Sequence, residues 1–217
     1  MTRRVAAPAG AALLLALSAA PTAASAATVA PASACTRYVD TRPPVPTLGV
    51  RTSGWAPGAP LTFKVGGKVV GTATADATGA FATATPQFVP PAPAGNFQTT
   101  TLTAEDGSGA VASVGMNLVR LTIDVPRKAA PSKRVKYKIF GFRPGAKLYL
   151  FIRRGGKVRG RFLLGRPRGE CGRLTKRLRY MPLKRWTTGR YEYWASNDAT
   201  FSTQTAVRAF AIDITPR

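Results

Sequence analysis

The 217-residue sequence predicts an all-β protein with two β-sandwich domains in tandem. Three observations support this fold class. The chain contains a long internal repeat, its β-rich runs are short and separated by turn residues, and it shows no sustained helical period outside its first residues. The length suits two domains of roughly 90 residues each. We therefore expect two small cores in place of one large core.

The internal repeat is anchored by two glycine-rich turns. Residues 54–58 (GWAPG) are matched 87 positions later by residues 141–145 (GFRPG). An alternating apolar and polar run precedes each anchor, which is typical of a half-buried strand. A strand and a Gly-Gly pair follow each anchor, at Gly66-Gly67 and Gly155-Gly156, and predict two-residue hairpins. The repeat therefore predicts the same strand order in both domains.

Further matches extend the repeat and set the domain bounds. Residues 79–81 match 172–174, residues 95–97 match 189–191, and residues 123–125 match 212–214. We expect a border near the proline-flanked segment 126–131, and the pattern leaves two alternatives for residues 121–125, which either close domain 1 or open domain 2. The predicted divisions are a signal peptide (1–26), a leader (27–39), domain 1 (40–125) and domain 2 (126–217).

The turn motifs resemble those of bacterial immunoglobulin-like domains from secreted actinobacterial proteins. The resemblance is carried by residues 54–58, by residues 72–81 (TATADATGAF) and by the second copy at 141–145. It implies two tandem immunoglobulin-like β-sandwiches with an adhesive, spacing or binding role. The Cys…Trp…Cys pattern of antibody domains is absent, because each half of the chain has at most one cysteine.

The N-terminus has the features of a cleaved secretory signal. Arg3 and Arg4 precede the apolar run 11–17, and small residues at 24–26 form a cleavage site. The apolar run is shorter than the roughly 20 residues that span a bilayer. We therefore expect a secreted, extracellular protein. Association with the cell wall is a further expectation, which depends on the anionic partner considered below.

Cys35 and Cys171 are the only cysteines of the chain. In an oxidising compartment a single disulfide between them is the default expectation, and it would close a long loop. An intermolecular bridge and two free thiols are the alternatives that the spacing leaves open. Two cysteines without any histidine cannot form an ordinary four-ligand zinc site, so we expect no metal.

The positive charge is concentrated in domain 2. Residues 40–125 contain five basic and five acidic residues, whereas residues 126–217 contain 24 basic and four acidic residues, a net charge of +20. Several of these cations alternate with apolar residues, which places them on the outer face of a sheet. The candidate polyanion-binding residues are Arg134, Lys136, Lys138, Arg153, Arg154, Lys157, Arg159, Arg161, Arg173, Arg177 and Arg179.

Two interpretations of this charge are open. A solvated sheet face must be polar, and arginine can serve there without any function. Solvated faces usually mix both signs, however, and a net charge of this size repels itself unless a polyanion or salt relieves it. The accessible partners would be an anionic wall polymer or acidic polysaccharide first, then an anionic membrane surface or nucleic acid. Nucleic acid would also need exposed aromatic residues, for which Trp186 and Trp194 are the candidates.

The sequence contains no recognisable catalytic constellation. It has no histidine and few carboxylates, and Asp76 and Asp106 stand in turn sequences. We therefore expect neither catalytic residues nor a cofactor. The leading hypothesis is a non-catalytic secreted protein that binds polyanions through domain 2. The alternative is an adhesin-type module whose protein partner contacts loops or a sheet edge.

Overall fold

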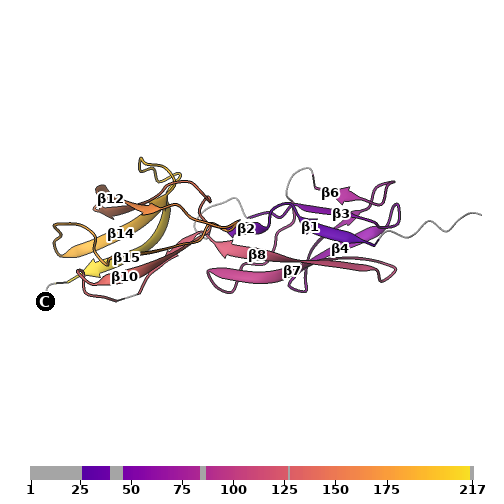
Figure 1. Ribbon diagram of the computed structural model, residues 1–217, viewed down its shortest axis with the longest axis horizontal. Coiled ribbons are helices and arrows are strands. Elements are labelled where there is room, and N and C mark those ends of the chain that lie inside the picture. The colour runs from indigo at the N-terminus through magenta and orange to yellow at the C-terminus, as the bar shows by residue number, and fades with distance from the viewer. Residues whose placement is uncertain (1–25, 40–45, 84–86, 127, 216–217) are drawn as a thin grey trace, which may run out of the picture.

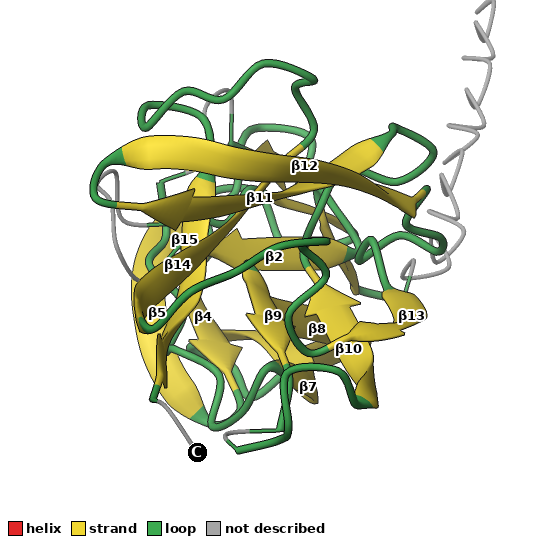
Figure 2. Cartoon of the chain, turned by 90° about the vertical axis from the view of Figure 1, so that its left-hand side faces the viewer, coloured by secondary structure: helices red, strands yellow, loops and turns green. Residues whose placement is uncertain are grey.

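The computed structural model describes residues 26–39, 46–83, 87–126 and 128–215. The predicted signal peptide lies outside these residues, apart from Ala26. Every regular element of the described chain is a β-strand (Figure 2). No helix in these ranges is long and apolar enough to cross a membrane. The strands form two units that lie end to end along the long axis of the molecule (Figure 1).

The first unit packs a three-stranded sheet, β1-β3-β6, against a five-stranded sheet, β2-β8-β7-β4-β5. All neighbouring strands are antiparallel except β2 and β8, which are parallel. Its strands are β1 (Thr28–Pro31), β2 (Cys35–Tyr38), β3 (Val50–Ser53), β4 (Pro60–Val65), β5 (Lys68–Thr74), β6 (Phe81–Ala82), β7 (Phe97–Asp106) and β8 (Val111–Arg120).

The second unit repeats this arrangement without a counterpart of β2. A three-stranded sheet, β9-β10-β13, faces a four-stranded sheet, β12-β11-β14-β15. Its strands are β9 (Thr122–Asp124), β10 (Arg134–Phe140), β11 (Leu148–Arg154), β12 (Lys157–Gly165), β13 (Leu174–Arg179), β14 (Gly189–Ser196) and β15 (Val207–Ile214). When β2 is not counted, strands one, two and five of each unit share one sheet and the others share the second, which is the division of an immunoglobulin-like sandwich.

The two predicted Gly-Gly hairpins are confirmed. Gly66 and Gly67 have φ angles of 57° and 79°, and Gly155 and Gly156 have 54° and 75°. These left-handed angles match the twist of a two-residue hairpin turn and cost a glycine little. The turns join β4 to β5 and β11 to β12, so both copies of the repeat make the same central hairpin.

Each unit has its own apolar core between its two sheets. On β10 the side chains of Val135, Tyr137 and Ile139 point inward and are buried, as the alternating pattern predicts. The phenols of Tyr137 and Tyr193 both donate to the Tyr180 carbonyl oxygen, at 3.0 and 2.7 Å. Burial away from water raises the pKa of both phenols. Both hydroxyls therefore remain satisfied donors inside the core.

The predicted leader is wrong as a separate segment. Residues 28–31 form β1, which pairs with β3, and residues 35–38 form β2, which pairs with β8. Gly54 explains why β1 belongs here, because a Cβ at this position would lie 2.8 Å from the Ala26 carbonyl oxygen. The first anchor of the repeat therefore packs directly against the chain that enters β1.

The border between the units also differs from the prediction. β8 ends at Arg120 and β9 begins at Thr122, and β9 pairs with β10 of the second unit. Residues 122–124 therefore belong to the second unit, and segment 126–131 lies inside it. The predicted match of 123–125 to 212–214 is wrong in structural terms, since residues 123 and 124 lie in the first strand of the unit and residues 212–214 lie in its last strand.

Candidate polyanion-binding surface

Five exposed cations form a two-column array on the outer face of β10 and β13, which we call the basic ladder. Arg134 lies opposite Arg179, and Lys136 lies opposite Arg177, in the antiparallel register of the two strands. The fifth member, Lys138, lies opposite Thr175 on β13 and opposite Asp124 on β9. The intervening residues of β10 fill the core, so the strand alternation holds all five cations on the solvent face.

The basic ladder is electrostatically unfavourable in isolation. Like charges directly opposite each other on a sheet destabilise the strand pair. None of the five cations forms an ion pair within 4.0 Å in the described chain. Successive members on one strand are about 7 Å apart, because same-face residues are separated by two rises of about 3.4 Å. The array therefore presents regularly spaced positive charge, and its two paired rungs, Arg134–Arg179 and Lys136–Arg177, have no acid between them.

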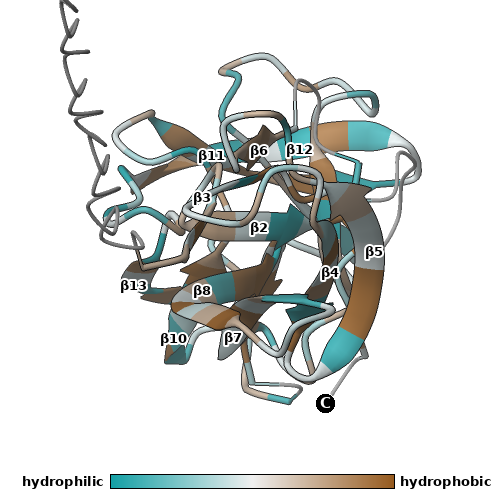
Figure 3. Ribbon diagram, turned by 90° about the vertical axis from the view of Figure 1, so that its right-hand side faces the viewer, coloured by the Kyte–Doolittle hydropathy of each residue, from teal (hydrophilic) through white to brown (hydrophobic). Residues whose placement is uncertain are grey.

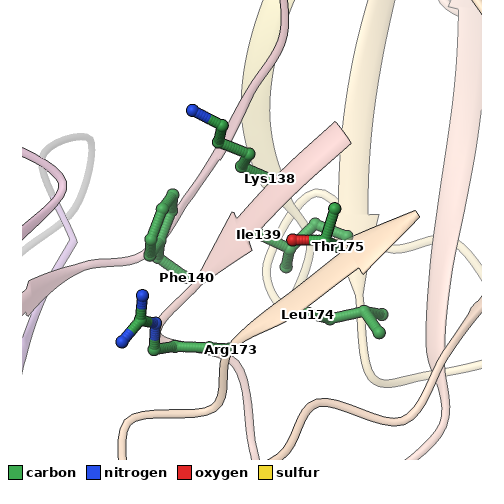
Figure 4. A pocket seen from close by; sticks show the side chains of 6 residues that line it. All are labelled: Lys138, Ile139, Phe140, Arg173, Leu174 and Thr175. Atoms are coloured by element: carbon green, nitrogen blue, oxygen red, sulfur yellow. The ribbon is translucent and has the colours of Figure 1, made fainter. Parts of the chain in front are cut away.

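The ladder ends at a hollow of about 400 Å³ beside the junction of the two units. Figure 4 shows Lys138 and Arg173 on either side of the Phe140 ring. The Arg173 guanidinium also lies over the ring of Phe97 in the first unit, 4.7 Å from its centroid. Arg173 is exposed, but this cation–π contact ties it to the junction as well as to the positive surface.

Two of the predicted binding residues are half-buried and use their guanidinium groups for contacts inside the unit. Arg153 is half-buried, forms an ion pair of 3.6 Å with Glu192, and lies over the rings of Trp194 and Phe201. Arg154 is also half-buried and donates to the Thr188 carbonyl oxygen at 2.5 Å. These contacts use the guanidinium groups internally, so we assign both residues to packing and omit them from the candidate surface.

The remaining predicted cations lie on the opposite sheet. Lys157, Arg159 and Arg161 are exposed on β12, an edge strand of the four-stranded sheet. Arg161 donates to the Ala199 carbonyl oxygen at 2.9 Å and lies over the Tyr149 ring. The eleven predicted residues therefore do not share one face, and the basic ladder is the part that forms a regular array.

The two tryptophans considered for stacking nucleic-acid bases differ in exposure. Trp186 is 44% exposed, whereas Trp194 is half-buried beneath Arg153 and Phe201. Tyr191 and Tyr193 are buried, as we expected for core residues. A row of exposed rings for stacking bases is therefore not present among the described residues.

The turn carboxylates have structural roles. Asp76 accepts hydrogen bonds from the Thr78 and Ala80 backbone amides at 2.8 and 3.0 Å, and Asp106 repeats this geometry with Ser108 and Ala110. Hydrogen bonds from the Thr78 and Ser108 hydroxyls lower the pKa of the two carboxyls. No cluster of three or more potential metal ligands occurs in the described ranges.

Cys35 and Cys171 form a disulfide that joins the two units. Their Cα atoms are 5.4 Å apart, and the bond is buried with Val119 between Phe97 and Phe140. Beside this cluster the Leu121 amide donates to the Tyr38 carbonyl oxygen at 2.6 Å. The short border, the apolar cluster and the covalent link together hold the second unit in place against the first.

Comparisons with known proteins give no sequence relative. No family model matches the chain, and no curated protein matches it. Among solved structures, the human OSCAR ligand-binding domain is 8% identical with a TM-score of 0.33, over 88% of this chain and 98% of that one. Fibronectin(III)-like modules of Clostridium thermocellum CbhA are 11% identical with a TM-score of 0.29, over 86% and 90%.

A tandem repeat from the extending region of a large adhesion protein is 17% identical with a TM-score of 0.29. That match covers 87% of this chain and 49% of the other. These scores are too low to assign a relative. The immunoglobulin-like character of both units rests on their own strand order.

Proposed function

We propose that this protein is a non-catalytic, extracellular binding protein that holds an anionic wall polymer on the basic ladder. The observation that carries this proposal is the pairing of cations across β10 and β13, beside which Asp124 on β9 is the one acid placed opposite a member of the ladder. A linear polyanion laid along the strands would relieve this repulsion at each rung. Many weak contacts of this kind add up along a polymer, as they do along nucleic acid backbones.

The first unit serves as a spacer in this proposal. Its net charge is near zero by sequence, and its ion pair between Lys64 and Glu105 compensates charge locally. The buried disulfide fixes the second unit on it, so the basic ladder has a defined orientation relative to the N-terminal end of the mature chain. Secretion remains part of the proposal, because it rests on the N-terminal sequence.

Binding across a salt series tests the proposal. The mature chain is incubated with purified wall, DNA or anionic vesicles, and the bound fraction is measured by sedimentation. We expect wall binding that weakens steeply as salt rises, because counterions are released from the polymer. A mature chain that stays in the supernatant with all three at low salt would overturn the polyanion function.

A matched pair of variants separates the ladder from net charge. Changing Arg134, Lys136 and Lys138 to glutamate should abolish most of the binding without unfolding, because all three side chains are exposed. The control changes Arg143, Lys147 and Arg168 to glutamate, which alters net charge equally at exposed positions outside the ladder. Equal losses in both variants would show that total charge, and not the ladder, governs binding.

A protein-binding role is the second candidate, and the free edge of β5 favours it. β5 ends the five-stranded sheet and includes a hydrophobic stretch (Figure 3). Val69 in this strand is 61% exposed. Lys68 is the only charged residue of this strand, so the edge has little of the charge that usually blocks strand addition. Binding that persists at high salt and is lost in Val69→Lys would favour this role.

A further inference from the structure

A second hollow, of about 300 Å³, lies at the end of the second unit away from the first. Its lining comes from the β11–β12 hairpin, from the loop before β14 and from β14 itself. β14 begins at Gly189, opposite Ile214 of β15, near the C-terminal end seen in Figure 1. The lining residues are Arg154, Arg159, Leu183, Arg185, Trp186, Thr187 and Tyr191.

Trp186 gives this hollow an exposed apolar wall. It is 44% exposed, and every other aromatic residue of the described chain is buried or half-buried. A large aromatic side chain left in water at a hollow, and not scattered on a flat surface, is a common mark of a ligand site. The indole offers a flat face against which a ring of a ligand can pack.

The loop that carries Trp186 is held by hydrogen bonds to the sheet. The Thr187 amide donates to the Tyr191 hydroxyl at 3.1 Å, and that hydroxyl donates to the Thr187 carbonyl oxygen at 3.0 Å. Arg154 donates to the Thr187 hydroxyl and to the Thr188 carbonyl oxygen. The loop is therefore preorganised, which reduces the ordering cost of binding at Trp186.

Glycine at 189 makes the Arg154 contacts possible. A Cβ there would lie 2.9 Å from the Arg154 guanidinium, and the φ angle of 136° is one that other residues rarely adopt. Arg154 also lies over the Tyr191 ring, 5.4 Å from its centroid. Arg154 thus supports the loop and leaves ligand contacts to its neighbours.

Arg159 and Arg185 supply the charge of the hollow. Both are exposed, neither has an ion-pair partner in the described chain, and no carboxylate lines the hollow. Arginine binds carboxylates through paired hydrogen bonds with defined geometry. The site therefore combines one flat apolar wall with two free guanidinium groups.

We infer that this hollow binds one acidic sugar unit, with the sugar ring on Trp186 and its carboxylate on Arg159 and Arg185. Single-stranded nucleic acid fits less well, because it binds by stacking successive bases on several aromatic residues and only one is exposed here. A simple phosphate polymer would make no use of the indole. The site is separate from the basic ladder and does not depend on the function proposed for it.

Isothermal titration of the mature chain with a trimer of galacturonic acid tests the inference. We expect binding to the carboxylated trimer and much weaker binding to its methyl-esterified form, which keeps the rings and removes the charge. Trp186→Ala should weaken binding about tenfold or more, as expected for the loss of an aromatic contact. Trp186→Phe should retain part of the affinity, because a smaller ring remains.

The charged half of the site is tested by a matched pair of variants. Arg159→Gln with Arg185→Gln should remove the preference for the carboxylated trimer. Arg143→Gln with Lys147→Gln removes the same charge elsewhere and should leave the preference intact. Unchanged affinity in Trp186→Ala, equal binding of the esterified trimer, or binding only to an oligothymidylate of similar length would each overturn the inference. The ladder variant with Arg134, Lys136 and Lys138 changed to glutamate should keep the preference for the carboxylated trimer while it loses wall binding, so failure here and failure of wall binding are distinguishable.

Discussion

Gly79 and Gly58 show how differently two glycines of one repeat are constrained. Both have left-handed φ angles, 74° and 75°. A Cβ on Gly79 would lie only 2.0 Å from the Trp55 carbonyl oxygen, whereas a Cβ on Gly58 would meet nothing within 4 Å. Gly172 in the second unit repeats the first case, with a distance of 1.5 Å to the Phe142 carbonyl oxygen. In both units, therefore, a glycine packs closely against the backbone of the aromatic residue in the anchor turn.

These two glycines give a matched prediction. Gly58→Ala should cost about 1 kcal/mol of unfolding free energy, which is the usual cost of alanine in a left-handed conformation. Gly79→Ala should cost clearly more, since the backbone around Trp55 must also move. Urea unfolding followed by tryptophan fluorescence, with Trp186 and Trp194 replaced by phenylalanine so that Trp55 alone reports, measures both. Equal losses in the two variants would contradict the steric explanation.

The sequence predicts individual site residues only where a strand is regular. Arg134, Lys136 and Lys138 follow strict alternation on β10, and their exposure agrees with the prediction. Arg153 and Arg154 lie beside a β-bulge between Ile152 and Arg153, where the register with β12 shifts. Their partners, Glu192 and Thr188, come from β14 and the loop before it. A run of charged residues in the sequence reveals neither the position of a β-bulge nor the partners that come from a distant strand.

At the scale of the strands, repulsion between the cations of the basic ladder destabilises the pairing of β10 with β13. Lys136 and Arg177 lie directly opposite each other, as do Arg134 and Arg179. Edge strands often carry charge to prevent pairing with other chains, and β13 is the edge of its sheet. One charged column on β13 would suffice for that purpose. The second column on β10, an interior strand, has no such explanation and favours a binding role.

This arrangement predicts opposite effects of one substitution on stability and binding. Lys136→Glu replaces repulsion across the strand pair with attraction, so it should stabilise the second unit by a few tenths of a kcal/mol at low salt. The same change should weaken sedimentation with wall. Thermal unfolding at low and high salt measures the first effect, with Lys147→Glu as the control outside the sheet. A loss of stability would show that the ladder is not repulsive.

The central hairpin of each unit could be predicted from the sequence. The strands at the beginning and end of each unit could not. The repeated anchors and Gly-Gly turns are local signals that identify the central hairpins in both units. β2 has only four residues and pairs with β8 far along the chain, so no local pattern marks it. Tripeptide similarity between residues 123–125 and 212–214 likewise carries no information on which strand of a sandwich each one occupies.

At the scale of the molecule, the junction combines three kinds of interaction. Only Leu121 separates the last strand of the first unit from the first strand of the second. The disulfide is buried in an apolar cluster with Phe97 and Phe140, and Arg173 lies over Phe97. Each unit also has a separate core. Loss of the covalent link should therefore loosen the junction before it unfolds either unit.

Replacement of both Cys35 and Cys171 by serine tests this order of events. We expect a larger radius of gyration in small-angle X-ray scattering and faster amide exchange in β2, with both cores still protected. The chain-entropy cost of opening a loop of 136 residues is about 5 kcal/mol, so the thermal midpoint should also fall. Scattering and exchange indistinguishable from the disulfide-bonded protein would show that noncovalent contacts alone set the orientation.

The position of the two cysteines also orders the events of biosynthesis. Cys35 emerges from the ribosome 136 residues before Cys171, so the bond cannot form until most of the chain has been synthesised. Until then β2 is held by noncovalent contacts, namely its hydrogen bonds to β8 and the burial of Tyr38 in the first core. A truncated chain that stops before Cys171 would leave Cys35 with an unpaired thiol. The oxidised bond therefore shows that synthesis passed Cys171, and a thiol-reactive label would detect chains interrupted before that residue.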